Sequence, residues 1–259
     1  MRENTYVRQT PSDVIFGIRS VIEAIRSERE INKIMILKGM KKELFQELKE
    51  ELANKDYLLQ FVPVEKLDRI TQENHQGVIA YVSPIKYLDV EEFVDSRLLA
   101  EQKTSILVLD RITDVRNFGA IARTAECQGI DAILIPSKGS AQVTADAVKT
   151  SAGALNRIPV CRTNDLKNSL FYLQQSGLRL IACTEKGNVP LYEANFRGNV
   201  AVIFGSEEDG ITSDLLNLSD IKARIPMRGE IASLNVGVSV GMALYEKTRQ
   251  ELYGQNVNT

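Results

Sequence analysis

Three polar clusters are the parts of this sequence whose residue types and spacing could support chemistry. They lie in residues 117–125, 204–211 and 225–246, and the first two directly follow apolar, strand-like runs. Ser233 and Asn235 are residue types that begin helices, so a helix starting there would direct unpaired backbone N–H groups and two short polar side chains into the space before it. Because open α/β sheets bind ligands in loops after their strands, these clusters predict a ligand-binding site.

Histidine and cysteine chemistry has little to draw on in this chain. His75 is the single histidine, and the three cysteines, Cys127, Cys161 and Cys183, are far apart in apolar surroundings. This pattern excludes nearly all zinc sites, and it excludes Ser-His and Cys-His nucleophilic catalysis unless His75 itself serves. An odd number of widely spaced cysteines indicates reduced thiols rather than a disulfide framework.

The composition is that of an ordinary folded protein. The chain has 259 residues, 44% hydrophobic and 25% charged, which is enough for two modest domains with cores of their own. No apolar run approaches the roughly 20 residues of a membrane helix, and the first residues lack the apolar core of a signal peptide, so we expect a cytoplasmic protein. The net charge of −2 argues against a nonspecific DNA coat protein but allows a local basic patch.

The first part of the chain predicts a small α/β domain. Apolar residues near helical spacing, among them Val14, Ile18 and Val21, predict a helix over residues 13–26. The following pattern predicts a strand over 33–37, a helix over 41–52 and strands over 57–61 and 77–82. The next stretch is charged and carries only a weak helical repeat. We therefore expect a domain over 1–84, a linker over 85–104 and a second domain over 105–259.

The second domain begins with a change of texture. Apolar runs without alternation lie at residues 106–109, 132–135, 178–182 and 200–204, and each is followed by polar loop and helix-like sequence. Continuous apolar runs are typical of strands covered on both faces. Strands that alternate with helices predict a parallel sheet with right-handed crossovers.

Common nucleotide-binding signatures are missing from this domain. The loop after the first apolar run, residues 112–119, contains neither a Gly-x-Gly-x-x-Gly fingerprint nor a Walker Gly-Lys-Ser/Thr. This disfavours dehydrogenases, P-loop enzymes and the common doubly wound methyltransferases, which also carry a glycine-rich first loop.

The three clusters, taken in order, resemble the motifs of the SpoU (TrmH-type) branch of the SPOUT methyltransferases. These enzymes transfer a methyl group from S-adenosylmethionine to ribose 2′-hydroxyls of RNA. The matching motifs are residues 117–125, residues 204–211, and residues 225–227 followed by 233–236. The segment from 15 to 80 is similar to the ribosomal-protein-like RNA-binding domain of members that act on ribosomes. The nearest resemblance is to members that methylate a guanosine of the large-subunit (23S) rRNA.

The resemblance implies an architecture and a set of partners. The second domain would be a trefoil-knotted parallel α/β sheet, an exception to the rule that chains do not thread loops. The small α/β domain before it would bind the RNA. The protein would act as a homodimer through the knotted domain, with S-adenosylmethionine as the methyl donor and no metal. Gly237, Ser239 and Gly241 could let helices pack closely between subunits or within one.

The resemblance assigns four residues to the cofactor: Gly205, Ile225, Met227 and Leu234. A glycine allows close approach of the backbone to a ligand, although Gly205 could equally be a turn residue at a strand end. Ile225 and Leu234 would otherwise be read as core residues.

The resemblance assigns five residues to catalysis: Asn117, Arg123, Glu207, Ser233 and Asn235. The ordinary alternatives are a helix cap for Asn117, an exposed ion pair between Arg123 and Glu126, and a solvated carboxylate for Glu207. Arg123 cannot act as a simple base, because its pKa lies above about 12, but its guanidinium could stabilise a developing alkoxide. Ser233 and Asn235 could cap a helix and contact a ligand together.

Two other functions share these features. A tRNA 2′-O-methyltransferase would carry the same motifs, and a non-catalytic RNA-binding ribosome-assembly factor would share the fold. The amino-terminal domain favours rRNA, and the intact set of catalytic residues disfavours a silent protein. Basic residues that could contact RNA phosphates are Arg19, Arg26, Lys38, Lys41 and Lys42. We expect His75 to be structural or to contact RNA.

Overall fold

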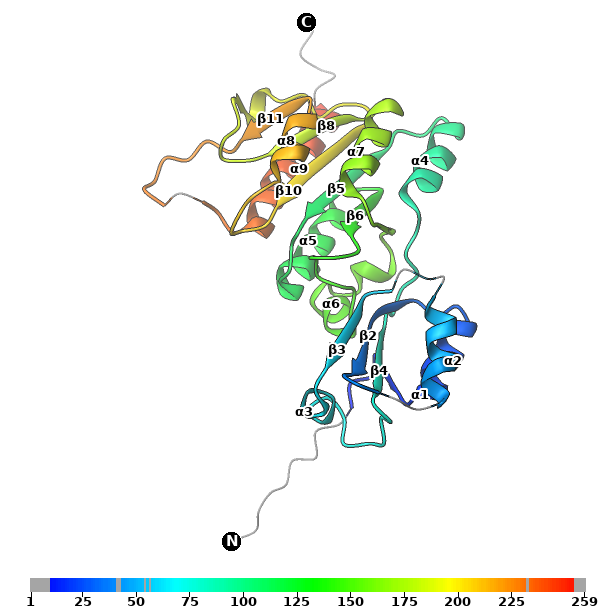
Figure 1. Cartoon of the computed structure of the whole chain (residues 1–259). Helices are drawn as coiled ribbons and strands as arrows, with labels where there is room; N and C mark the ends of the chain where they lie inside the picture. Colours follow the sequence, from blue (N-terminus) through cyan, green and yellow to red (C-terminus); the bar gives the residue numbers. More distant parts are fainter. Residues whose placement is uncertain (1–9, 41–42, 54, 56, 232, 254–259) are drawn as a thin grey trace, which may run out of the picture. The chain divides into compact units, whose positions relative to one another are not determined.

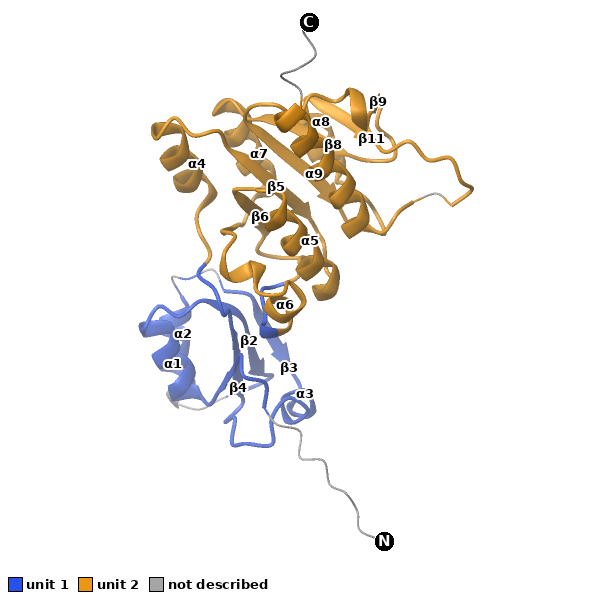
Figure 2. Cartoon of the chain, turned by 180° about the vertical axis from the view of Figure 1, so that it is seen from behind, with its two compact units in different colours: residues 1–86, 142–145 blue, residues 87–141, 146–259 orange. Residues whose placement is uncertain are grey.

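The chain forms two compact units in a computed structural model that describes residues 10–40, 43–53, 55, 57–231 and 233–253. Unit 1 holds the described residues up to Lys86 together with Gln142–Ala145, and unit 2 holds Tyr87–Ala141 and the described residues from Asp146 onwards (Figure 2). Lys41 and Lys42, two of the expected RNA contacts, lie outside the described residues.

Unit 1 is a four-stranded sheet in the order β1-β4-β2-β3. Only β2 and β3 are parallel; β4 runs antiparallel to both of its neighbours. Helices α1 and α2 cover one face of this sheet, and the short α3 packs on the other (Figure 1). The elements are β1 (Val14–Phe16), α1 (Ile18–Arg26), β2 (Ile31–Leu37), α2 (Glu43–Leu52), β3 (Leu59–Val62), α3 (Val64–Asp68) and β4 (Val78–Val82).

The helix predicted over residues 13–26 is wrong in its first part. Val14–Phe16 is a strand that pairs with β4, and the helix begins only at Ile18. Gly17 separates the two with a φ of 88°, a conformation that residues with a side chain rarely adopt. The apolar residues of the strand and of the helix follow each other at near-helical spacing, so the sequence predicted one helix where the structure has a strand and a helix.

Unit 2 is a seven-stranded sheet in the order β7-β6-β5-β10-β8-β11-β9, and every pair in it is parallel, which confirms the predicted sheet. Its strands are β5 (Ser105–Asp110), β6 (Ala132–Pro136), β7 (Val160–Thr163), β8 (Arg179–Cys183), β9 (Val189–Pro190), β10 (Val200–Gly205) and β11 (Ile221–Arg224). The four apolar runs became β5, β6, β8 and β10, which form the middle of the sheet. β5 is buried along its whole length.

Helices cover both faces of this sheet (Figure 1). α5 and α9 pack against each other on one face, while α4, α7 and α8 share a core with the strands on the other. The helices are α4 (Val90–Leu99), α5 (Val115–Cys127), α6 (Ala145–Thr150), α7 (Leu166–Gln175), α8 (Ser213–Leu218) and α9 (Val236–Tyr253). None of the helices in the described ranges is long and apolar enough to cross a membrane.

The segment expected as a linker, residues 85–104, contains α4. Val90 and Val94 of this helix are buried in the same core as Leu170 and Leu173 of α7. Phe93 and Leu98 pack against the same core only in part, and the other half of the helix is polar, which explains why the helical repeat is weak in the sequence.

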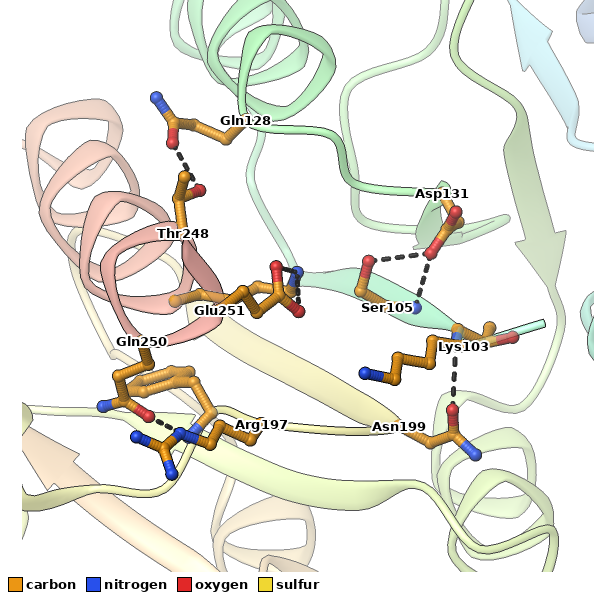
Figure 3. Close-up of polar contacts among 12 residues, drawn as sticks. Lys103, Ser105, Gln128, Asp131, Arg197, Asn199, Thr248, Gln250 and Glu251 are labelled. Carbon is orange, nitrogen blue, oxygen red and sulfur yellow. Dashed lines mark hydrogen bonds and ion pairs between the residues drawn. The ribbon is translucent and has the colours of Figure 1, made fainter. Parts of the chain in front are cut away.

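Side chains tie the amino-terminal ends of the strands together (Figure 3). Asp131 Oδ2 accepts hydrogen bonds from the Ser105 backbone N–H at 2.7 Å and the Ser105 hydroxyl at 2.8 Å, and Asn199 Oδ1 accepts one from the Thr104 N–H at 3.0 Å. The Thr248 hydroxyl donates to Gln128, which joins α9 to the end of α5. The carboxyl-terminal ends of the strands remain available for loops that bind ligands.

Candidate functional site

Three polar side chains from different parts of unit 2 meet beyond the carboxyl ends of β5 and β10. The side-chain amide of Asn117 donates to Glu207 Oε1 at 3.1 Å, and the amide of Asn235 donates to the same oxygen at 2.9 Å. Asn235 Nδ2 also lies 3.2 Å from Asn117 Oδ1. The structure therefore brings together one residue from each of the three sequence motifs.

Asn117 is free for this contact because another residue caps its helix. α5 begins at Val115, and the carboxylate of Asp114 accepts hydrogen bonds from the backbone N–H groups of Arg116 and Asn117 at 2.7 and 2.8 Å. The ordinary alternative for Asn117, a helix cap, is thus wrong. Its side chain lies in the first turn and reaches across to Glu207.

Asn235 is the cap of its helix and a member of the trio at the same time. Its Oδ1 accepts hydrogen bonds from the N–H groups of Gly237 and Val238 at 3.0 and 3.3 Å, so its Nδ2 is left to donate to Glu207. The Val236 N–H lies 3.4 Å from the same carboxylate oxygen. Glu207 Oε1 thus receives all of these donors, and Oε2 has no partner among the described residues.

The loop that carries Glu207 folds tightly back on itself. A Cβ atom at Gly205 would lie 2.0 Å from the backbone carbon of Gly210, so only glycine fits there. Gly210 has a φ of 69°, in the left-handed region, and its N–H donates to the Ser206 carbonyl at 2.9 Å. The close approach found at Gly205 is to another part of the same loop, as for a turn residue at a strand end, and the expected approach to a ligand stays a prediction.

Arg111 holds this loop to the end of β5, and sequence reasoning missed it. Its guanidinium lies 2.9 Å from Asp209 Oδ2, 3.1 Å from the Gly210 carbonyl oxygen and 3.2 Å from Asp110 Oδ1. The other Asp110 oxygen accepts the Thr212 N–H at 2.8 Å. Arg111 has a φ of 60°, a strained backbone conformation for a residue with a side chain. The Asp110-Arg111 pair suggests only an ordinary surface ion pair in sequence.

The first cavity lies beside the trio and measures about 320 Å³. Loop segments 204–211, 225–227 and 233–236 contribute most of its lining, and Cys183–Lys186 and Ser239 complete it. Each of the residues expected to bind the cofactor lies in this lining: Gly205, Ile225, Met227 and Leu234. Ser233 lines the same cavity, so it lies with the expected cofactor residues rather than in the trio.

A second cavity of about 240 Å³ adjoins the first. Ser206, Glu207, Glu208, Asp209 and Val236 line both. Asn117 and Arg111 line only the second. The Glu207 carboxylate therefore belongs to the boundary between two spaces, an arrangement suited to a reaction between two ligands.

The structure does not bring Arg123 to either of these cavities. It lies exposed in α5, six residues after Asn117, and it forms no ion pair within the described part of the chain. Glu126, its expected partner, instead lies 3.9 Å from Arg157.

The histidine and the three cysteines take part in no catalytic arrangement among the described residues. His75 Nε2 lies 2.9 Å from Asp68 Oδ1, and the Gly77 N–H donates to its Nδ1 at 2.9 Å, so both ring nitrogens serve the local turn. All three cysteines are free. Burial raises the pKa of Cys183, in the wall of the first cavity, to about 12, and burial with the charge of Asp89 raises the pKa of Cys161 to about 12.

Comparisons with known proteins cover both units. Residues 104–245 match the model of the SpoU rRNA Methylase family, and residues 14–88 match a model described as RNA 2′-O ribose methyltransferase substrate binding. A Staphylococcus aureus protein named as a TrmH-family tRNA/rRNA methyltransferase is 34% identical over 240 residues, which span 92% of this chain and 96% of that protein.

Solved structures share the fold. The SpoU methyltransferase AviRb from Streptomyces viridochromogenes, in complex with AdoMet, has a TM-score of 0.58 at 20% identity and covers 92% of this chain and 90% of its own. A structure concerned with 2-OH methylation of C/U34 on tRNA is 29% identical, with a TM-score of 0.53, and covers 57% of this chain and 97% of its own.

Proposed function

Because the chain belongs to the SpoU family and is an S-adenosylmethionine-dependent RNA 2′-O-ribose methyltransferase, we propose that its substrate is a guanosine of large-subunit (23S) rRNA. The observation that carries the proposal is the Asn117–Glu207–Asn235 trio, whose Glu207 lines two adjoining cavities. A substrate of this kind would place the enzyme in the cytoplasm.

The first cavity fits the cofactor. Its lining comes largely from the loops around Gly205, Ile225 and Leu234, the positions that the family resemblance assigns to the cofactor. Met227 and Leu234 would contact the adenosine of the cofactor, and Ser233 would contact the polar groups of the cofactor. When bound, S-adenosylmethionine supplies an electrophilic methyl group on a sulfonium sulfur.

The second cavity would hold the target ribose. Asn117 and Asn235 fix Oε1 of Glu207, so Oε2 is left to accept a hydrogen bond from the ribose 2′-hydroxyl. This hydrogen bond would align the 2′-oxygen for direct displacement at the methyl carbon, which leaves the sulfonium sulfur. We assign to Arg123 the stabilisation of the alkoxide as the hydroxyl proton leaves to phosphate or water. Since Arg123 lies outside both cavities of its own chain, this role requires a second subunit.

A homodimer through unit 2 is part of the proposal. α9 exposes Val238, Met242 and Tyr245 at helical spacing, an apolar stripe that a second copy could cover. Thr124, next to Arg123 in the sequence, lies near Gly241 of α9, so the segment of α5 that carries Arg123 packs against α9. Gly237 and Gly241 themselves face α5 of the same chain, so their small size already serves an internal helix contact. The trefoil knot of the family is also proposed for this unit.

For the domains we propose RNA binding by residues 1–84, a connection over 85–104 and methyl transfer by 105–259. Mapping 2′-O-methyl groups in rRNA and tRNA from cells with and without the protein tests the substrate. We expect one 23S guanosine to lose its methyl group in cells without the protein. Loss confined to tRNA would favour the tRNA alternative, which the 29% identical structure supports, and no loss would favour a ribosome-assembly factor.

A further inference from the structure

The sheet of unit 1 has one face that its helices leave partly open. α1 and α2 bury the side chains of one face, and α3 covers only the part of the other face around Met35, Val62 and Ile79. Beyond α3, Val14, Tyr81 and Lys33 lie side by side on three neighbouring strands, and Tyr81 and Lys33 are half-buried. Unit 1 thus presents a half-buried aromatic and a half-buried basic side chain on this face.

The charges at this surface are not balanced. The Lys33 ammonium lies 4.4 Å from the centre of the Tyr81 ring. Burial lowers the pKa of Lys33, and the nearby positive charge of Lys66 on α3 lowers this pKa further. Neither lysine forms an ion pair with a carboxylate in the described ranges of the chain. Two neighbouring cations without an acidic partner repel each other, so an anion would stabilise both.

We propose that Lys33, Lys66 and Tyr81 form a surface that binds single-stranded RNA, with phosphates on the two lysines and a base on the part of the tyrosine ring that Lys33 leaves uncovered. The inference rests on the proposed function, since it names where the RNA substrate is held. Aromatic side chains on an open sheet beside basic residues form the stacking surfaces of many single-strand binders. Asp13 acts on Tyr81 as a nearby negative charge and sets one limit of the surface.

Arg26, another basic residue of unit 1, fits this role less well. Arg26 is held by Glu47 at 3.0 Å and Glu51 at 2.8 Å, which neutralise its charge. Lys49 provides a matched control, because its ammonium also lies over an aromatic ring, 5.0 Å from the centre of Phe45, but in α2 on the opposite face.

The test measures binding of a fluorescein-labelled single-stranded RNA of mixed sequence to the full chain over a range of salt. Lys33→Met and Lys66→Met should each weaken binding about fivefold near 0.1 M salt and reduce the salt slope by about 0.7, the value for one phosphate contact. Tyr81→Leu should weaken binding about tenfold, Tyr81→Phe should leave it unchanged, and Asp13→Asn should strengthen it. Lys49→Met should behave as the wild type. Circular dichroism and S-adenosylmethionine binding confirm folding.

Several results would overturn the inference. Wild-type affinity and salt slope in both lysine variants would show that this face is merely solvated, and an equal loss in Lys49→Met would show that any lysine suffices. Failure of the wild type to bind the RNA would also exclude it. If the Lys33, Lys66 and Tyr81 variants lost methylation of ribosomal particles but kept methylation of protein-free rRNA, the face would bind a ribosomal protein and not RNA. Weaker binding in the lysine variants, without any methylated site in cells, would leave the surface standing while the proposed function fails.

Discussion

Two asparagines of the same type do different work at this site. Asn235 caps α9 through its oxygen and donates through its nitrogen, whereas Asn117 leaves capping to Asp114 and uses its amide on Glu207. Both amides converge on one carboxylate oxygen. The role of each residue follows from which neighbour satisfies the backbone N–H groups at the helix start.

Arg111 should act as a positioning residue for Glu207. Arg111→Gly suits the backbone φ of 60° but removes the contacts to Asp209 and Gly210, so we expect kcat/KM to fall about 10- to 100-fold with little change in the unfolding temperature. Lysine should restore little, because an ammonium lacks the planar fork.

The matched measurement is a double-mutant cycle with Asp209→Ala. If the two residues work as one clasp, the double variant should be no slower than Arg111→Gly alone. Fully additive losses would instead indicate that Arg111 contacts the RNA independently.

Cys161 should make stability depend on pH in alkaline solution. The pKa of Cys161 in the folded protein is raised to about 12, while a thiol in the unfolded chain has a pKa near 9. The protonated thiol therefore contributes fully to the free energy of unfolding below pH 9, and this contribution is lost as the pH rises toward 12. Urea unfolding near pH 8 and near pH 10 should show a fall for the wild type that exceeds that of Cys161→Ala by up to about 1.4 kcal/mol per pH unit. Parallel curves would contradict this account.

Among the elements of the fold, the strands that are buried on both faces could be predicted from the sequence. β5, β6, β8 and β10 gave continuous apolar runs, whereas β7 and β11 include Arg162 and Lys222 and lie further out in the sheet, so they gave no such run. β1 merged with α1 because only Gly17 separates them.

The candidate site was predictable to the extent that its motifs resemble a family. The order of the motifs indicated Asn117, Glu207 and Asn235, and the structure shows that they touch. The Arg111 clasp joins segments that are far apart in sequence, so no local pattern could reveal it. The cap by Asp114 is local, because the aspartate precedes the capped residues by two and three positions, and it was overlooked in favour of Asn117.

The amino-terminal edge of the sheet should govern stability without affecting catalysis. Asp131 accepts two hydrogen bonds from Ser105 and pairs with Arg97 at 2.5 Å, at the strand ends opposite the site. Asp131→Ala leaves these donors without their partner and should cost about 2–4 kcal/mol of unfolding free energy. Asp131→Asn keeps an acceptor and should cost less. Turnover per folded molecule should stay at the wild-type level in both, and a selective loss of turnover would refute the separation.

At the scale of the whole molecule, the proposed dimer predicts that subunits complement each other. Arg123→Ala and Asn117→Ala should each abolish methyl transfer, since one lacks the guanidinium and the other breaks the trio. If Arg123 serves the partner's site, mixed dimers of the two variants contain one intact site and should recover activity, to about a quarter of the wild type in a random mixture. No recovery after subunit exchange would confine each site to a single chain.

The wall of the first cavity has a chemical consequence for the enzyme itself. A methyl donor reactive enough to alkylate a ribose hydroxyl would be held beside Cys183, and a thiolate is a far stronger nucleophile than a hydroxyl. Because burial raises the pKa of Cys183 to about 12, the sulfur stays protonated near neutral pH. Mass spectrometry after long incubation with S-adenosylmethionine should find Cys183 without an added methyl group. The raised pKa of this thiol thus protects the enzyme from methylation by its own methyl donor.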